Sequence, residues 1–383
     1  MRKLILVTLL GILAAIVLAR ARLPEPGTAV FAPADRGYNL LDLRFPGGTE
    51  TAGSGQAGEL SSYFQSLAPT EKHAFSGALA GKSLLLVCAD DWAPDPDDAL
   101  RNPTLARLAR QSVPLGDVWR PEWYQGAEGR LFARLTGLVP TRADDRSALV
   151  YAAAQKVALP FSLPSAFVRA GYDCRAFGGP DSLPVEELTA LGFASVEPAD
   201  ALTDALQAAQ TPVFFYVQWS GNGEVALAEL WRVLGGERRA DTALCLLTSD
   251  ADPERAQLYL WGAGLTGASG DAPCSELDLT PTLLDLFGLA YDSRLLSGRD
   301  ILASDDGTAL VTLRGSAFSD WVTARGRCAS ATGIFTGDPP DGMDAETYIG
   351  QMALRIYRRY IYARRALECD WFRLLMNENG AGD

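Results

Sequence analysis

The stretch Ser83 to Ala89, SLLLVCA, decides the fold class, and it is followed at once by Asp90 and Asp91. After its first residue the run is apolar without interruption, and it does not alternate between apolar and polar residues. Such a run is typical of a parallel strand that is buried on both faces. Functional sites in parallel sheets lie beyond the carboxyl ends of the strands, so the two aspartates are candidate site residues.

Segments on either side repeat the order strand, loop, helix. Further buried strands are predicted at 211–218 (TPVFFYVQ), 242–248 (TALCLLT) and 257–261. Helices are predicted at 102–112, 163–170, 226–234 and 279–286, where apolar residues recur at helical spacing. This alternation predicts an α/β fold: a three-layer α/β/α sandwich with a mostly parallel central sheet.

The N-terminus predicts export. Met1-Arg2-Lys3 is a short basic region, Leu4 to Leu18 is apolar, and Ala19-Arg20-Ala21 has the small-x-small form of a signal-peptidase site. The apolar run is shorter than the roughly 20 residues of a spanning helix, but flanking residues could extend it. Residues 1–21 are therefore a cleaved signal peptide or a retained membrane anchor. The protein is expected to be secreted or periplasmic, or anchored facing the extracytoplasmic side.

The rest of the chain divides into three parts. Residues 22–80 are expected to form a juxtamembrane linker, rich in Pro, Gly, Ala and Thr, with a lead-in helix near 60–79. Residues 81–340 hold the α/β pattern. Residues 341–383 are a C-terminal helical segment, with one long helix expected over 346–376. Its arginines and aromatic residues indicate an amphipathic helix packed on the domain, or alternatively a surface for a partner protein or for anionic headgroups.

Composition limits the possible partners. The formal net charge of −13 argues against nucleic-acid binding, which needs a basic face. The six cysteines are scattered and include no CxxC, which argues against a zinc site. Cys328 and Cys369, both near the C-terminus, are the pair most expected to form a disulfide in an exported chain.

Four aspartates at strand ends are candidate metal ligands. Asp90 and Asp91 follow the strand at 83–89, and Asp250 and Asp252 follow the strand at 242–248. Paired carboxylates need a cation or hydrogen-bond donors to stay ionised, and Mg²⁺, Ca²⁺ or Mn²⁺ would suit oxygen ligands. For Asp90 and Asp91, the alternative is that one of them caps a helix. No organic cofactor is expected.

Several segments together resemble a known family. SLLLVCADDWAPD (83–95), LPSAFVRAGYDCRAFGG (163–179), TPVFFYVQWSGNGE (211–224), TALCLLTSDAD (242–252) and SELDLTPTLLDLFGL (275–289) with GRDIL (298–302) resemble, in order, segments of sulfatases and their relatives in the alkaline phosphatase superfamily. With LFARLTGLVPT (131–141), the subgroup of closest resemblance is the lipoteichoic acid synthase-like one. The resemblance implies a sulfatase-like domain over 81–340.

Residue by residue, the resemblance also implies a degenerate active site. Asp90 matches the family's first metal-binding acid and Asp91 the second acid of sulfatases. The nucleophile loop falls on Ala127 and Glu128, where a threonine would be expected. Ala251 stands where the family has the histidine of an Asp-His motif that Asp250 begins.

Other histidine positions agree with this interpretation. Asn222 lies in a loop that often supplies another histidine of the family. The chain has a single histidine, His73, which lies outside the matched region and is expected to face solvent or to sit near a helix N-terminus. The sequence therefore keeps the strands and helices of the family but lacks the nucleophile and the histidines that the family's chemistry uses.

The resemblance leads to one main expectation and two alternatives. The main one is an exported, membrane-anchored protein that has lost catalysis and acts as a binding or regulatory component in cell-envelope polymer or lipid modification. The first alternative is an active metal-dependent phosphotransferase or ester hydrolase with a carboxylate-based site. The second is an assembly platform whose C-terminal helix docks an envelope-biosynthesis protein.

Overall fold

The computed structural model describes residues 37–41, 43–46, 55–122, 126–140, 159, 161–179, 182–210, 212–303, 310–313, 320–329 and 332–379. The expected signal or anchor at 1–21 lies outside these residues. Within the described parts of the chain, no helix is long and apolar enough to cross a membrane.

An eight-stranded sheet forms the centre of the molecule, in the order β4-β3-β5-β1-β6-β7-β2-β8. Its strands are β1 (Ser83–Ala89), β2 (Val118–Trp119), β3 (Asp173–Gly178), β4 (Ser195–Pro198), β5 (Val213–Gln218), β6 (Thr242–Ser249), β7 (Arg255–Trp261) and β8 (Cys274–Ser275). β7 runs antiparallel to both of its neighbours, and the other pairings are parallel. The predicted, mostly parallel sheet is confirmed.

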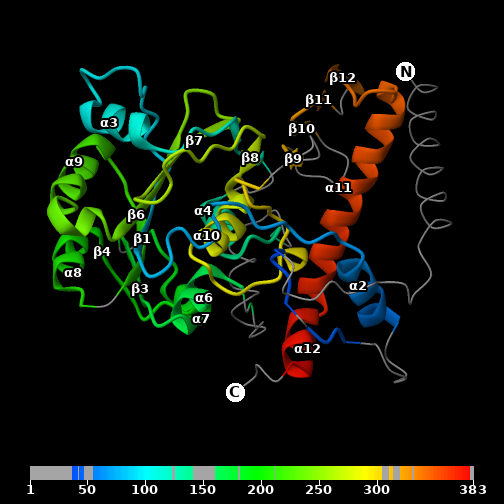
Figure 1. The fold of residues 1–383 in the computed structure, drawn as a ribbon, viewed down its shortest axis with the longest axis horizontal. Coiled ribbons are helices and arrows are strands. Elements are labelled where there is room, and N and C mark those ends of the chain that lie inside the picture. Colours follow the sequence, from blue (N-terminus) through cyan, green and yellow to red (C-terminus); the bar gives the residue numbers. More distant parts are fainter. Residues whose placement is uncertain are drawn as a thin grey trace.

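Helices cover both faces of the sheet (Figure 1). They are α3 (Pro103–Gln111), α4 (Ala127–Thr136), α6 (Leu163–Arg169), α7 (Val185–Leu191), α8 (Leu202–Ala208), α9 (Gly223–Val233) and α10 (Leu279–Leu286). A further helix, α2 (Gly55–Gln65), lies away from the sheet, beside the C-terminal helices. Short 3₁₀ turns lie at Ala199–Ala201, Gly236–Arg239, Glu276–Asp278 and Ser293–Leu295. The predicted helices at 102–112, 163–170, 226–234 and 279–286 correspond to α3, α6, α9 and α10.

The buried strands separate two hydrophobic cores. Alternate residues of β1 point to opposite faces, so Leu85 and Val87 join the core under α3, α8 and α9, whereas Leu84, Leu86 and Cys88 join the core under α4, α6 and α10. Both faces of β1 are buried, which explains why its sequence is apolar and does not alternate between apolar and polar residues. The predicted three-layer α/β/α sandwich is thus confirmed.

The turn after α10 shows why a glycine stands at position 298. A Cβ atom there would lie 1.9 Å from the carbonyl oxygen of Leu277. The backbone N–H of Gly298 donates to the carbonyl of Gly137, and that of Arg299 donates to Asp278 Oδ1. The 298–302 segment is thereby fixed across the start of α10 and the end of α4.

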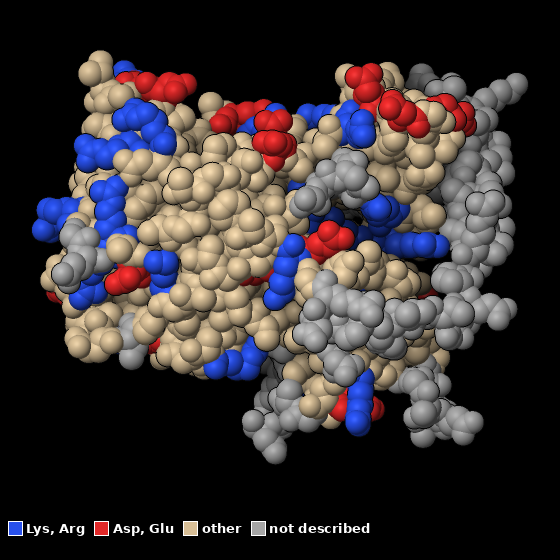
Figure 2. All heavy atoms as spheres, viewed as in Figure 1, with Lys and Arg blue, Asp and Glu red and all other residues tan. Residues whose placement is uncertain are grey.

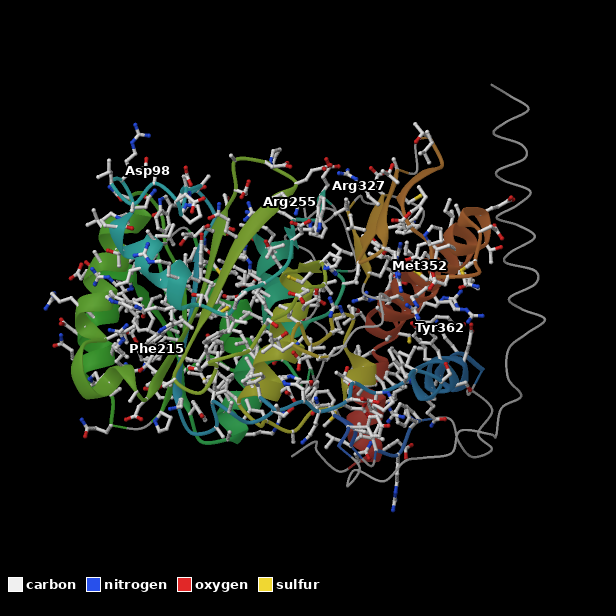
Figure 3. The ribbon with its side chains drawn as sticks, turned by 45° about the horizontal axis from the view of Figure 1, so that its top comes forward. Asp98, Phe215, Arg255, Arg327, Met352 and Tyr362 are labelled. Atoms are coloured by element: carbon white, nitrogen blue, oxygen red, sulfur yellow. The ribbon has the colours of Figure 1, made fainter. Side chains whose placement is uncertain are left out.

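A second sheet, which was not predicted from the sequence, lies beside the first. Its strands are β9 (Leu310–Thr312), β10 (Trp321–Thr323), β11 (Gly326–Ala329) and β12 (Ile334–Gly337), all antiparallel. Trp119 of β2 joins the two sheets, because its ring is covered by the guanidinium groups of Arg255 and Arg327. Figure 3 shows these two arginines approaching one another from the two sheets.

The C-terminal segment consists of two helices, not the single helix expected over 346–376. α11 (Ala345–Glu368) ends at Cys369, and α12 (Trp371–Glu378) begins after Asp370, whose φ of 56° breaks the helix. α11 packs its apolar side on the second sheet through Tyr348, Met352 and Ile356. The expected packing of this segment on the domain is therefore observed.

Two further expectations are wrong. The helix expected near 60–79 is displaced toward the N-terminus, as α2 at Gly55–Gln65, because turns occupy most of 66–81.

The expected disulfide between Cys328 and Cys369 is not formed, since all six cysteines are free thiols. Cys328 lies in β11 of the second sheet and Cys369 packs against the main core, so the two belong to different hydrophobic clusters.

Candidate functional site at the carboxyl edge of the sheet

Asp90 lies at the carboxyl end of β1 and is bound by a buried arginine. Arg134 of α4 donates from Nη2 to Asp90 Oδ1 at 2.6 Å and from Nη1 to Oδ2 at 3.0 Å. This two-bond geometry between a guanidinium and a carboxylate is the strong form of the ion pair. The side chain of Arg134 is only 1% exposed, and that of Asp90 is 11% exposed.

The opposite edge of the same guanidinium binds a second carboxylate. Arg134 Nε donates to Glu276 Oε2 at 2.9 Å and Nη2 donates to Oε1 at 3.2 Å. Glu276 is fully buried, in the turn that precedes α10. Arg134 therefore lies between two carboxylates, and Arg120, whose Nε is 3.5 Å from Glu276 Oε1, adds a second positive charge beside them.

Two more arginines surround Asp90. Arg120 donates from Nη2 to Asp90 Oδ1 at 3.3 Å and from Nη1 to Ser249 Oγ at 2.8 Å, while Arg130 Nε lies 3.8 Å from Asp90 Oδ1. Burial alone would raise the pKa of Asp90, but Arg134, Arg130 and Arg120 hold this pKa well below its usual range. Asp90 is thus a carboxylate held by guanidinium groups.

The other predicted metal ligands have separate roles. Asp91 is exposed to solvent. Asp250 accepts the backbone N–H of Asp252 at Oδ1 and the side-chain amide of Gln257 at Oδ2. Asp252 accepts the backbone N–H of Glu254. Asp250 and Asp252 therefore shape the turn between β6 and β7, and the hydrogen bond from Asp252 is the main reason that the pKa of Asp250 is lowered.

A divalent cation at Asp90 does not fit this arrangement. Both oxygens of Asp90 accept from guanidinium nitrogens, so a cation would have to displace Arg134 or enter against its charge. Among the described residues, the one group of His, Cys, Asp or Glu with three potential ligand atoms within 4.8 Å of one another lies elsewhere. Metal binding by Asp90, Asp91, Asp250 and Asp252 stays a prediction.

The positions that resemble catalytic positions are occupied by structural residues. Ala127 and Glu128 form the first turn of α4, after Gly126. Asn222 caps α9 by accepting the backbone N–H of Val225. Ala251 lies exposed in the turn after β6. None of these four side chains has an imidazole or a hydroxyl group.

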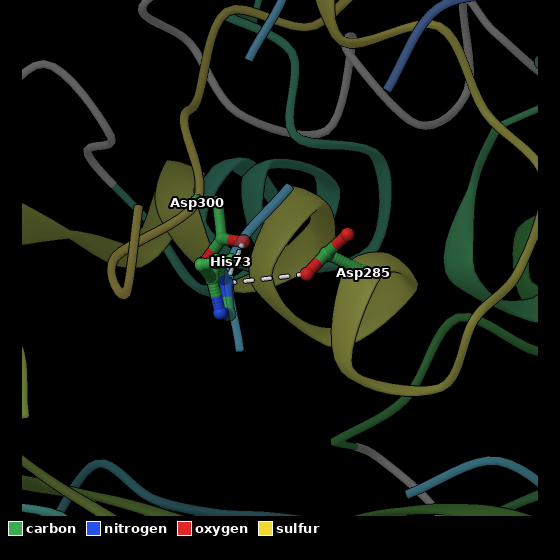
Figure 4. Close-up of side chains that lie close together, drawn as sticks. All are labelled: His73, Asp285 and Asp300. Atoms are coloured by element: carbon green, nitrogen blue, oxygen red, sulfur yellow. Dashed lines mark hydrogen bonds and ion pairs between the residues drawn. The ribbon is translucent and has the colours of Figure 1, made fainter. Parts of the chain in front are cut away.

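His73 does not face solvent as expected. Its Nε2 lies 2.8 Å from Asp300 Oδ2 and 3.2 Å from Asp285 Oδ2, and both carboxylates are buried (Figure 4). Asp285 also accepts from Asn39 Nδ2 and Ser76 Oγ. The cluster thus ties the segment before β1 to α10 and to the 298–302 turn.

Burial and the hydrogen bonds within this cluster shift the pKa values of its three residues. Burial opposes the charged form of His73, but the hydrogen bonds to Asp285 and Asp300 outweigh it and raise the pKa of His73 to about 9. Burial raises the pKa of Asp300. The pKa of Asp285 is lowered despite burial, because His73, Ser76 and Asn39 donate to its carboxylate.

These three residues are also the group that could hold a metal ion. Their hydrogen bonding favours a proton instead. In the neutral ring, the backbone N–H of Phe75 donates to His73 Nδ1 at 3.2 Å, so the one ring proton lies on Nε2, between the carboxylates. A histidine that binds a metal through Nε2 donates a hydrogen bond from Nδ1, and here Nδ1 faces a donor.

Sequence reasoning missed Arg134, Glu276 and the partners of His73. Arg134 stands in a run that is otherwise apolar, LFARL, whereas Glu276 stands in CSELDL beside two other polar residues, Ser275 and Asp278. A charged residue inside a buried run was the available signal, because such residues are seldom buried without a partner. His73 gave no comparable signal, since Asp300 is 227 residues away in sequence.

Comparisons with known proteins support the fold. No family model matches the sequence, and no curated protein matches it. Among solved structures, the lipoteichoic acid synthase LtaP from Listeria monocytogenes is similar with a TM-score of 0.60 and 12% identity, over 82% of this chain and 97% of that one. A protein in the alkaline phosphatase superfamily from Vibrio parahaemolyticus is similar with a TM-score of 0.54 and 14% identity, over 78% and 90%.

Proposed function

The chain has the α/β fold of the alkaline phosphatase superfamily protein and of LtaP, and we propose that it is an exported protein of this fold that does not catalyse ester chemistry. In this proposal it acts as a binding or regulatory component in the modification of a cell-envelope polymer or lipid. The envelope role comes from the similarity to a lipoteichoic acid synthase together with the export signal expected at 1–21.

One observation carries the loss of catalysis: the ion pair between Asp90 and Arg134. A metal-dependent esterase would use an acid at this strand end to hold a cation that activates a nucleophile and neutralises the ester. Here the acid is already neutralised by a guanidinium that is 1% exposed. The first turn of α4, with Ala127 and Glu128, offers no hydroxyl group to activate.

Attachment to partners is the second part of the proposal. Residues 1–21 would hold the domain at the membrane. The C-terminal helices would contact an envelope-biosynthesis protein through the side of α11 that does not pack on the second sheet, where Arg355 and Arg364 are exposed. Fractionation of cells that express the full chain, compared with cells that express a chain starting at residue 22 behind a cleavable signal, tests the attachment.

The catalytic question has a direct test. The full-length protein is incubated with aryl phosphate, aryl sulfate and phosphodiester substrates, with Mg²⁺, Ca²⁺ or Mn²⁺ and with chelator. We expect turnover no higher than that of the Asp90→Ala variant. Metal-dependent turnover that is lost in Asp90→Ala would instead establish the alternative, an active hydrolase or phosphotransferase with a carboxylate-based site.

A further inference from the structure

A groove of about 690 Å³ lies at the opposite end of the sheet from Asp90, between the end of α3 and the end of β7. One wall is formed by Arg110, Gln111 and the 112–114 segment, and the other by the turn at 262–268. Arg239 and Trp261 also line it. The groove is large enough for a small ligand or for a short piece of a polymer.

Its charge is opposite to that of the protein. The chain has 47 acidic and 34 basic residues, yet the charged residues that line this groove are two arginines, Arg110 and Arg239. A neighbouring groove of about 600 Å³, on the other side of the 112–114 segment, is lined by Asp117, Asp250 and Asp252 together with Arg255. The charged residues of this groove are thus all basic, whereas those of the neighbouring groove are mostly acidic.

Arg239 is held in a fixed position. Its guanidinium carbon lies 4.7 Å from the ring centre of Trp231 and 5.4 Å from that of Trp261. The two rings lie 5.0 Å apart, and Arg239 Nη2 donates to Gln111 Oε1 at 2.7 Å. Stacking fixes the plane of a guanidinium while its remaining N–H groups stay available along the edge.

The surrounding surface adds positive charge. Figure 2 shows Lys and Arg side chains gathered over α3 and α9. The exposed arginines of these helices are Arg107 and Arg110 on α3 and Arg232 on α9. A positive field at the mouth of the groove would raise the local concentration of anions around an otherwise acidic protein.

We propose that this groove binds a phosphate-bearing ligand through Arg239 and Arg110. The fork of a guanidinium matches two oxygens of a phosphate, and the stacking on Trp231 and Trp261 limits the orientations that Arg239 can take. The small residues of the 262–268 turn leave room for the rest of the ligand. This site is independent of Asp90, so it does not depend on whether the carboxyl edge of the sheet is catalytic.

The proposal is tested by titrating the full-length protein with methyl phosphate and with inorganic polyphosphate, with methanol and acetate as comparison solutes. Calorimetry gives the affinity, and tryptophan fluorescence reports on the groove because Trp231 and Trp261 contact Arg239. Binding of both phosphates indicates a site for a single phosphate group. Binding of polyphosphate alone indicates that the ligand is a polymer.

Matched variants locate the site. Arg239→Gln and Arg110→Gln are each expected to weaken phosphate binding about tenfold or more, since each removes a charged hydrogen-bond partner. Arg232→Gln, on the same face but outside the lining, is expected to change it less than twofold. Because Arg110 is exposed, Arg110→Gln is expected to fold, and it tests the site even if Arg239→Gln does not fold. Absence of binding, or equal weakening by all three changes, would overturn the proposal.

Discussion

The guanidinium of Arg134 forms two parallel hydrogen bonds with the carboxylate of Asp90, at 2.6 and 3.0 Å, and its other edge binds Glu276. Replacing Arg134 removes the one guanidinium that hydrogen-bonds both carboxylates and leaves them short of counter-charge at a buried position, with Arg120 and Arg130 as the remaining neighbours. We expect Arg134→Met to lower the free energy of unfolding by about 3–5 kcal/mol in chemical denaturation.

An exposed ion pair provides the control for this loss. Arg101, 86% exposed, lies 3.6 Å from Asp98, so Arg101→Met is expected to cost less than about 1 kcal/mol. Adding Asp90→Asn and Glu276→Gln to Arg134→Met should recover part of the lost stability, because the unpaired charges are gone. Equal losses for the two single arginine variants would show that Arg134 does not neutralise the two acids.

Divalent cations should not change the stability of the natural protein. Since Arg134 supplies the counter-charge at Asp90, the melting temperature is expected to be the same with chelator and with millimolar Mg²⁺, Ca²⁺ or Mn²⁺. In Arg134→Met, which removes the arginine that binds both Asp90 and Glu276, added Mn²⁺ should raise the melting temperature. A metal-dependent rise in the natural protein would support the predicted ligands Asp90, Asp91, Asp250 and Asp252.

His73 should make the protein less stable as the pH rises above neutral. Its pKa is raised to about 9 in the folded chain, above the ordinary value of about 6.5, so folding favours the protonated ring. The stabilisation is complete below pH 6.5 and is lost as the pH rises through 9. Relative to His73→Gln, the natural protein should lose on the order of 2 kcal/mol across this window, measured by urea unfolding. Parallel pH curves for the two proteins would contradict the charge assignment.

Two glycines should respond oppositely to alanine. Gly298→Ala would place a methyl group 1.9 Å from the Leu277 carbonyl oxygen, and should cost about 3 kcal/mol of stability. Gly350→Ala, in α11 with nothing within 4 Å of the new methyl group, should stabilise by about 0.5–1 kcal/mol. Thermal melts of both variants check the prediction, and a tolerated Gly298→Ala would refute the close approach.

The central sheet could be predicted from sequence because its signal is local. The strand at 83–89 and the helix at 279–286 have the bounds that their apolar patterns indicated. The second sheet was missed because its strands are three or four residues long and carry no strong periodicity. Break points such as Asp370 were missed as well, since a helical pattern continues on both sides of it.

The candidate site could be predicted only in part, for a physical reason. Asp90 was found because it follows a buried strand, a relation within the local sequence. Its partners Arg134 and Glu276 come from segments that meet it only in the folded chain. A strand-end acid looks the same in sequence whether its counter-charge is a metal ion or an arginine, so the pattern alone could not distinguish the two.

The cluster around His73 also makes the protein its own reporter. Because the chain contains one histidine, a proton NMR spectrum carries the ring signals of a single imidazole, and they need no assignment. That ring lies between Asp285 and Asp300 and joins the segment before β1 to the turn after α10. The chemical shifts of the His73 ring protons would therefore report whether the segment before β1 stays packed against α10 and the 298–302 turn when a ligand, a membrane or a partner is added.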